Sequence, residues 1–282
     1  MSLTDDLPDA PIPSPPFVTY DSIVRRIWGD GDIMLFVFAG AAAEFALNRA
    51  VDWLFFTGNL PADPMARLFS TARFVKEIVF VDEAVALQTM DRINRIHQAV
   101  EQERGEQIPQ WAHRDVLDLL IDYSERAYHL LHRPLTTAEK EALYRVFWRV
   151  GRGLHIPALP DAYAEWQQDR AHHLQQDLEH SHYTDELYTR YRRQLGPWRL
   201  AILRQVQALL APEFVAQQLN LKPWPLFQHL LRAYRPLVRI GLKPLIRRLL
   251  VPREHIEQVR QMDEPTNKVF RRLDTHPLSR VE

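Results

Sequence analysis

Apolar side chains recur at steps of three and four along much of this chain, and this spacing limits the fold to packed helices. One such stripe comprises Leu68, Thr71, Val75, Ile78 and Val79. A second stripe comprises Ala86, Met90, Ile93, His97 and Val100. We find no alternation of Val, Ile and Thr that would indicate a β-strand, and no internal repeat. The sequence therefore predicts an all-α fold.

The composition narrows the functional classes. The 282 residues are enough for one large domain with a sizeable core. A net charge of −1 argues against a general nucleic-acid-binding protein. The chain has no cysteine, which excludes disulfides, iron–sulfur clusters, thiolate-ligated haem and cysteine-based zinc sites. Any metal must therefore be held by histidine or carboxylate groups, and no GxGxxG or Walker phosphate loop is present.

Local signals place several helix boundaries. Asp63 followed by Pro64 predicts an N-cap and a first helical residue, and Thr136 with Glu139 predicts a capping box. Residues 33–56 form the most apolar stretch, but polar residues interrupt it, so no run reaches the roughly 18 residues of a membrane span. We interpret this stretch as a buried central helix.

His97 is the first candidate site residue, because its stripe position points it inward. A buried histidine needs a hydrogen-bond partner or a metal. Arg67 lies one turn before Thr71 on the neighbouring helix, so the two helices could enclose a small-molecule or cofactor site. A plainer interpretation has His97 bonded to a backbone carbonyl and Thr71 bonded to its own helix. Periodicity does not separate these interpretations.

Glu44 is a second candidate, because it is a carboxylate between Ala43 and Phe45 in the apolar stretch. It is either paired with an arginine or directed at the cofactor pocket. His129 and His132 are three residues apart, but they lie at a helix end, where surface histidines are favoured by the helix dipole.

Two carboxylate-x-x-His pairs resemble the metal ligands of helical bundles; they are Asp169 with His172, and Asp177 with His180. Bundle sites draw such pairs from different helices. Here both pairs lie on one helix of low hydrophobicity, so we interpret them as a solvated, histidine-rich face.

A set of scattered positions connects these helices to a known family: Asp63, Pro64, Arg67, Leu68, Thr71, Phe74, Val75, Val79, Phe80, Arg92, Ile93, His97 and Val100. The pattern continues through Leu135, Thr136, Glu139, Ile156, Pro157 and Pro160. It covers residues 28–222 and resembles the family that groups the MpaB-like oxygenases with the latex-clearing rubber oxygenases.

The resemblance implies a single globin-like, multi-helix orthogonal bundle that encloses a cofactor pocket with haem b. It implies that His97 is the axial iron ligand and that Arg67 and Thr71 lie on the distal, oxygen-binding side. Ser70, beside them at the cofactor, stands where the rubber oxygenases have a lysine. We therefore expect neither lysine ligation nor rubber as the native substrate.

The segment 222–253 differs from the rest in character. It has no acidic residue, and its basic residues include Arg232, Arg235, Arg239, Lys243, Arg247, Arg248 and Arg253. Leucines and Trp224 accompany them, and prolines break the run. Such a segment either binds an anionic membrane surface or wraps the core with its cations facing solvent or haem propionates.

These observations predict three regions: a disordered tail (1–16), a helical oxygenase-like domain (17–222), and a basic amphipathic extension with a polar tail (223–282). The N-terminus lacks the basic start and apolar core of a signal peptide, so a cytoplasmic location, with peripheral membrane binding, is expected.

The leading functional hypothesis is a haem b-dependent oxygenase that cleaves or oxidises an apolar, unsaturated, isoprenoid-type lipid with O2. One alternative is a non-catalytic, membrane-peripheral helical protein in which His97 is a core residue. Another is a non-haem oxygenase that holds iron or manganese through His97 and Glu101, one helical turn apart.

Overall fold

The computed structural model describes residues 14–56, 63–227, 229, 231, 234 and 243–263. Within these residues the chain forms α-helices, one 3-10 helix and no β-strand, which confirms the predicted all-α, multi-helix fold. The helices are α1 (Ile23–Trp28), α2 (Gly31–Phe45), α3 (Asp52–Phe56), α5 (Pro64–Val79), α6 (Glu83–Arg104), α7 (Gln110–Leu131), α8 (Thr137–Gly153), α9 (Tyr163–Gln176), α10 (His182–Leu210), α11 (Glu213–Gln218), α13 (Lys243–Leu250), η1 (Arg253–His255) and α14 (Ile256–Asp263).

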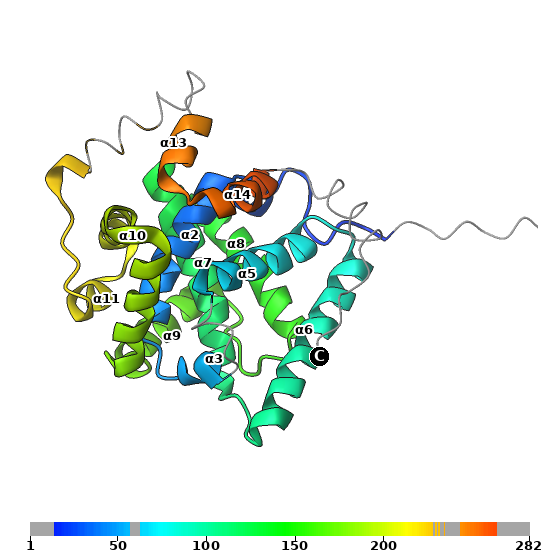
Figure 1. Cartoon of the computed structure of the whole chain (residues 1–282). Coiled ribbons are helices and arrows are strands. Elements are labelled where there is room, and N and C mark those ends of the chain that lie inside the picture. Colours follow the sequence, from blue (N-terminus) through cyan, green and yellow to red (C-terminus); the bar gives the residue numbers. More distant parts are fainter. Residues whose placement is uncertain are drawn as a thin grey trace, which may run out of the picture.

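Helix α2 is the centre of the bundle, and α7, α10 and α14 pack around it (Figure 1). Met34 and Val37 are completely buried. The closest approach is to α7, where a β-carbon at Gly40 would collide with the ring of Tyr123. Only glycine allows this approach of the two helices, and α7 in turn carries several polar side chains toward α2.

The central helix is shorter than the sequence predicts. It ends at Phe45, because Asn48 Oδ1 accepts a hydrogen bond from Ala50 N at 2.8 Å and so stabilises a turn. Asn48 then forms an isolated β-bridge with Leu178, and helix α3 begins only at Asp52.

Helices α5 and α6 form a corner at residues 79–83 and diverge from it (Figure 1). The predicted start of α5 is confirmed, since Asp63 Oδ1 accepts from Ala66 N at 2.9 Å and Pro64 is the first helical residue. Helix α6 ends at Arg104, and the φ of 74° at its C-cap, Gly105, belongs to the left-handed region. The predicted capping box of Thr136 and Glu139 begins α8.

The C-terminal helices α13 and α14 pack against this core (Figure 1). Lys76 Nζ donates to the carbonyls of Gln261 at 3.1 Å and Met262 at 2.8 Å. Asp263 Oδ1 accepts from Gly31 N at 2.8 Å, at the first turn of α2. The Arg247 guanidinium lies 2.5 Å from Asp32 Oδ1, so this cation of the basic segment faces the core.

Parts of the predicted terminal regions lie outside the described residues. They are residues 1–13 of the tail, residues 264–282, and, in the basic segment, residues 228, 230, 232–233 and 235–242. The predicted division at residue 222 stays a prediction. Among the described helices, none has both the length and the apolar character required to cross a membrane.

Candidate functional site

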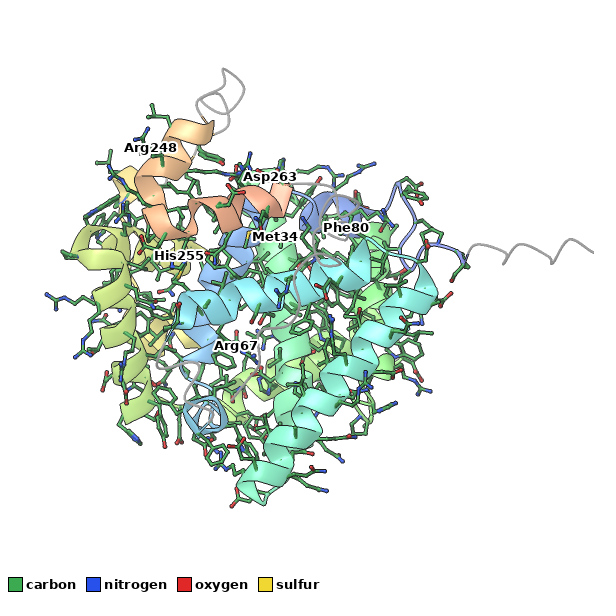
Figure 2. All side chains as sticks on the ribbon, turned by 45° about the vertical axis from the view of Figure 1, so that its right-hand side comes forward. Met34, Arg67, Phe80, Arg248, His255 and Asp263 are labelled. Atoms are coloured by element: carbon green, nitrogen blue, oxygen red, sulfur yellow. The ribbon has the colours of Figure 1, made fainter. Side chains whose placement is uncertain are left out.

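The first turns of α5 carry three of the predicted site residues. Arg67 lies on the side of α5 that faces the angle between α5 and α6 (Figure 2). The hydroxyls of Ser70 and Thr71 both donate to the Arg67 carbonyl, at 2.8 and 3.1 Å. Thr71 is therefore bonded to its own helix, as in the plainer interpretation of the sequence. Each hydroxyl oxygen retains lone pairs that can accept a further hydrogen bond.

Helix α6 presents His97 about three turns after Ala86, its first buried residue. Ala86 and Met90 are fully buried, whereas His97 is half-buried. Its ring lies against the ring of His113 from α7, with centroids 4.7 Å apart and planes tilted by 47°. No hydrogen bond joins His97 to another described residue. The plainer interpretation, in which a backbone carbonyl accepts a hydrogen bond from His97, therefore has no such carbonyl among the described residues.

The electrostatics of this region favour a neutral imidazole. Desolvation, then the neighbouring His113 and Arg67, lower the pKa of His97 to about 4. Arg67 is accessible to water, yet desolvation lowers the pKa of its guanidinium. This combination indicates that Arg67 lies in a recess of the protein rather than on a convex surface.

The chemistry of His97 fits a residue that would hold the iron of a haem. A ligating histidine must be neutral and have a free ring nitrogen, and His97 meets both conditions among the described residues. Arg67 is near enough for its charge to act on His97, although it comes from the other helix. Glu101, the carboxylate of the non-haem alternative, accepts a hydrogen bond from Ile108 N at 2.9 Å and so stabilises the loop after α6.

A second group of polar residues is buried between α2, α7 and α9. Glu44 is fully buried, and both of its carboxylate oxygens accept from Arg170, at 2.5 and 2.6 Å. Arg170 also donates to Asp122 Oδ2 at 3.0 Å, and the Tyr123 hydroxyl donates to Glu44 at 3.0 Å. The arginine partner that the sequence offered as one alternative for Glu44 is therefore Arg170.

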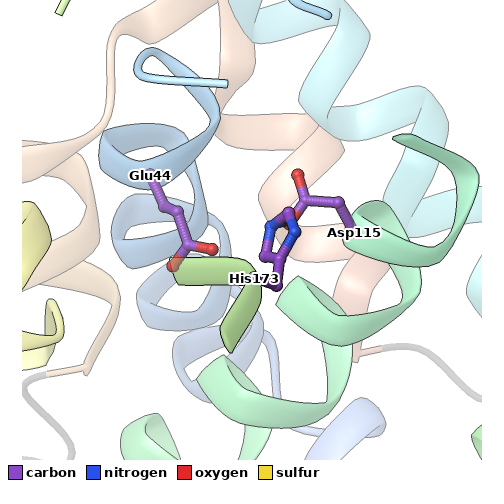
Figure 3. Close-up of side chains that lie close together, drawn as sticks. All are labelled: Glu44, Asp115 and His173. Atoms are coloured by element: carbon purple, nitrogen blue, oxygen red, sulfur yellow. Dashed lines mark ion pairs between the residues drawn. The ribbon is translucent and has the colours of Figure 1, made fainter. Parts of the chain in front are cut away.

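His173 extends this network by one turn of α9. Figure 3 shows its ring beside the carboxylate of Asp115, with Glu44 approaching from α2. His173 Nε2 contacts Asp115 Oδ1, and its Nδ1 lies 2.7 Å from Asp177 Oδ2. The amide of Asn48 donates to the other oxygen of Asp115. A histidine between two carboxylates is held in its protonated form.

The ligand atoms of Glu44, Asp115 and His173 lie within 4.8 Å of one another, a spacing that a metal ion could use. However, the Arg170 guanidinium is paired with Glu44 and lies 3.8 Å from Asp115. Burial opposes the charge of Arg170, but Glu44 and Asp122 outweigh it and keep the pKa of Arg170 above its usual value. A metal beside a permanent cation would be repelled, so we assign the role of counter-ion to Arg170.

The network predicts a fall in stability as the pH rises. Burial opposes protonation of His173, but Asp115 and Asp177 raise its pKa to about 9 from 6.5. At this site the folded state therefore binds more protons than the unfolded state between these values, and the contribution of His173 to stability is fully present below pH 6.5. We expect the free energy of unfolding to fall by about 3 kcal/mol through that window, measured by urea denaturation.

The variant His173→Gln should lose most of this pH dependence, while His172→Gln, which changes an exposed histidine of the same helix, should keep it. Burial also raises the pKa of Asp118 to about 7 from 3.8, which lowers stability with rising pH in an earlier window. Equal slopes for wild type and His173→Gln above pH 6.5 would contradict the assignment.

Asp115, Arg170 and His173 were not predicted from the sequence. The signal was present, since Asp115, Asp118 and Asp122 repeat at steps of three and four on α7, but such spacing is also typical of a solvated face. His172 and His180 are exposed, as predicted, but the prediction of one helix for both pairs is wrong, because α9 ends at Gln176 and the pair of Asp177 and His180 lies beyond it. His129 and His132 are exposed as well, and His132 stacks on Tyr128 at 4.9 Å.

Comparison with known proteins gives one match. The model of the family described as "ER-bound oxygenase mpaB/B'/Rubber oxygenase, catalytic domain" matches residues 25–240, which is most of the chain. No curated protein and no solved structure matches the chain. The matched range includes both the His97 region and the buried network.

Proposed function

Because the chain belongs to the family of mpaB and rubber oxygenase catalytic domains, and is thus an oxygenase, we propose that it is haem-dependent and acts at His97. The observation that carries this proposal is the His97 ring, which has no hydrogen bond to a described residue and lies within electrostatic reach of Arg67. Bound haem would supply the chemistry that activates O2.

In this proposal the chain's own residues have separate roles. His97 holds the cofactor through a ring nitrogen. Arg67 donates hydrogen bonds toward negative charge that develops on oxygen, and its recessed position strengthens them. Thr71 positions oxygen through the lone pairs that its bond to the Arg67 carbonyl leaves available. Ser70 shares that carbonyl and lies at the same edge of the site.

We propose an unsaturated, lipid-like substrate of the isoprenoid type. Cleavage breaks the carbon–carbon double bond, and each of its two carbons receives one atom of O2. Two carbonyl groups form, so the atoms balance without an external reductant. With Ser70 in place of lysine, we expect small lipids rather than rubber to be cleaved.

The variants Arg67→Ala and Thr71→Val test this function. Each should retain haem, because neither side chain holds the iron, but each should lose oxygenase turnover. Loss of one charge-stabilising donor costs on the order of a hundredfold in rate. Turnover is measured as O2 consumption and carbonyl formation with a short unsaturated isoprenoid.

Arg73→Gln is the matched control, because Arg73 is an exposed arginine of the same helix, 3.7 Å from Glu77. It should keep wild-type turnover. If both Arg67→Ala and Thr71→Val are as active as this control in a single turnover, the catalytic part of the proposal fails.

We also propose peripheral binding to an anionic membrane, where such a lipid would be found. Trp224, Leu226 and Leu245 have exposed fractions of 56, 69 and 64%, and Arg248 of the same basic segment is also exposed. Each cation near an anionic leaflet contributes on the order of 1 kcal/mol. Exposed charges are screened over about 10 Å at 0.1 M salt, so binding should weaken steeply with salt.

Co-sedimentation with anionic and neutral vesicles tests this binding. We expect preferential binding to anionic vesicles at low salt, reduced in Trp224→Ser and unchanged in Trp198→Ser, which alters an exposed tryptophan of α10. If the protein stays in the supernatant with anionic vesicles at low salt, the basic segment has only a structural role and the membrane proposal fails.

A further inference from the structure

A histidine that holds a metal needs its ring plane fixed. Proteins usually do this with a hydrogen bond from the second ring nitrogen to a carbonyl or carboxylate. His97 makes no such bond with the described residues. Packing against a neighbouring side chain is the other way in which a ring plane can be fixed.

The neighbour that contacts the ring is His113. The two ring centroids are 4.7 Å apart and the planes are tilted by 47°, a geometry within the range of favourable aromatic contacts. No hydrogen bond joins the two rings. The two rings are therefore in van der Waals contact, and the face of one ring limits the rotation of the other.

His113 is well placed for this role because the first turn of α7 is anchored. Asp115, two residues later, is fully buried and bonded to Asn48 and His173. Two residues along a helix turn by about 200°, so Asp115 and His113 point to opposite sides of α7. The buried network thus holds one side of this turn, and the turn presents His113 to His97 on the other.

We propose that His113 is a positioning residue for His97, and that its ring fixes the plane of the imidazole that would hold the haem iron. This inference rests on the proposed function. It assigns to α7 a part in the site that was not predicted from the sequence. The ring, rather than a nitrogen of His113, performs the role.

Paired variants separate the ring from its nitrogens. His113→Ala removes the contact, whereas His113→Phe keeps an aromatic ring without nitrogen. Loss of a residue that orients a metal ligand typically costs 10–100-fold in affinity, and we expect haem dissociation from His113→Ala to accelerate by about that factor. The electron paramagnetic resonance signal of the ferric haem, which depends on imidazole orientation, should broaden or shift.

His113→Phe should restore both the dissociation rate and the spectrum, and His172→Ala should leave both unchanged. Circular dichroism checks that each variant remains helical. A wild-type spectrum and dissociation rate in His113→Ala overturn the proposal. Failure of His113→Phe to rescue also overturns it, because a nitrogen of His113 would then be required.

A measurement on the protein without haem tests the contact between His113 and His97 independently of the proposed function. In the full-length apoprotein, the ring protons of His97 should shift in the NMR spectrum of His113→Ala, because the ring current of His113 is lost. If the wild type binds no haem, the proposed function fails on its own. If the NMR shift is present but the haem-bound variants behave like wild type, only the inference on His113 fails.

Discussion

The variant His97→Ala should purify without haem while its helical content stays close to that of the wild type. His97 is half-buried, so its truncation leaves the core of α2 and α7 intact, but it removes the nitrogen that we propose as the iron ligand. The measurements are the Soret absorbance, the haem-to-protein ratio and far-ultraviolet circular dichroism.

His172→Ala is the control, because it removes an exposed histidine from α9. It should retain full haem content. Added imidazole should partly restore haem binding to His97→Gly, since a free ring can occupy the space left by the side chain. A wild-type Soret band and haem ratio in His97→Ala would exclude this residue as the ligand.

The second large effect is expected at Arg170. Arg170→Met keeps most of the side-chain volume but leaves Glu44 buried without its cation, whereas Asp122 keeps its pair with Arg126. Breaking a buried pair from one side typically costs 3–5 kcal/mol, and we expect a loss of about that size in the free energy of unfolding. Urea denaturation followed by circular dichroism measures it.

Arg190→Met is the matched control, since Arg190 pairs with Glu186 on the surface of α10 at 3.0 Å. Exposed pairs of this kind are worth about 0–1 kcal/mol. Arg170→Lys should fall between the two, because it keeps the charge but loses the two-pronged contact with Glu44. A stability of Arg170→Met equal to that of the control would show that the network contributes little.

Much of the architecture follows from local signals. Asp63 with Pro64 and Thr136 with Glu139 determine helix starts through contacts over three residues, so they could be predicted without a fold. The break of the apolar stretch after Phe45 was missed. Its cause is the side chain of Asn48, which both turns the chain and reaches Asp115 on another helix.

The candidate site was accessible to sequence reasoning only in part. The stripe position of His97 predicted a residue that points inward, and its side chain is half-buried. Its neighbour His113 belongs to a helix whose orientation no local pattern specifies. The same holds for Glu44. An arginine partner could be predicted from the sequence, but not which arginine it is. Arg170 is 126 residues away along the chain, and only the crossing of α2 and α9 brings the two together.

The bond between Gly31 and Asp263 has a consequence for the order in which the protein forms during synthesis. The two residues are separated by 232 positions, yet Asp263 accepts from the first turn of the central helix. At 5–20 residues per second, the ribosome needs on the order of 10–50 s to reach the second partner after making the first. During that interval the start of α2 lacks this partner, so this end of the central helix is completed only when most of the chain has been made.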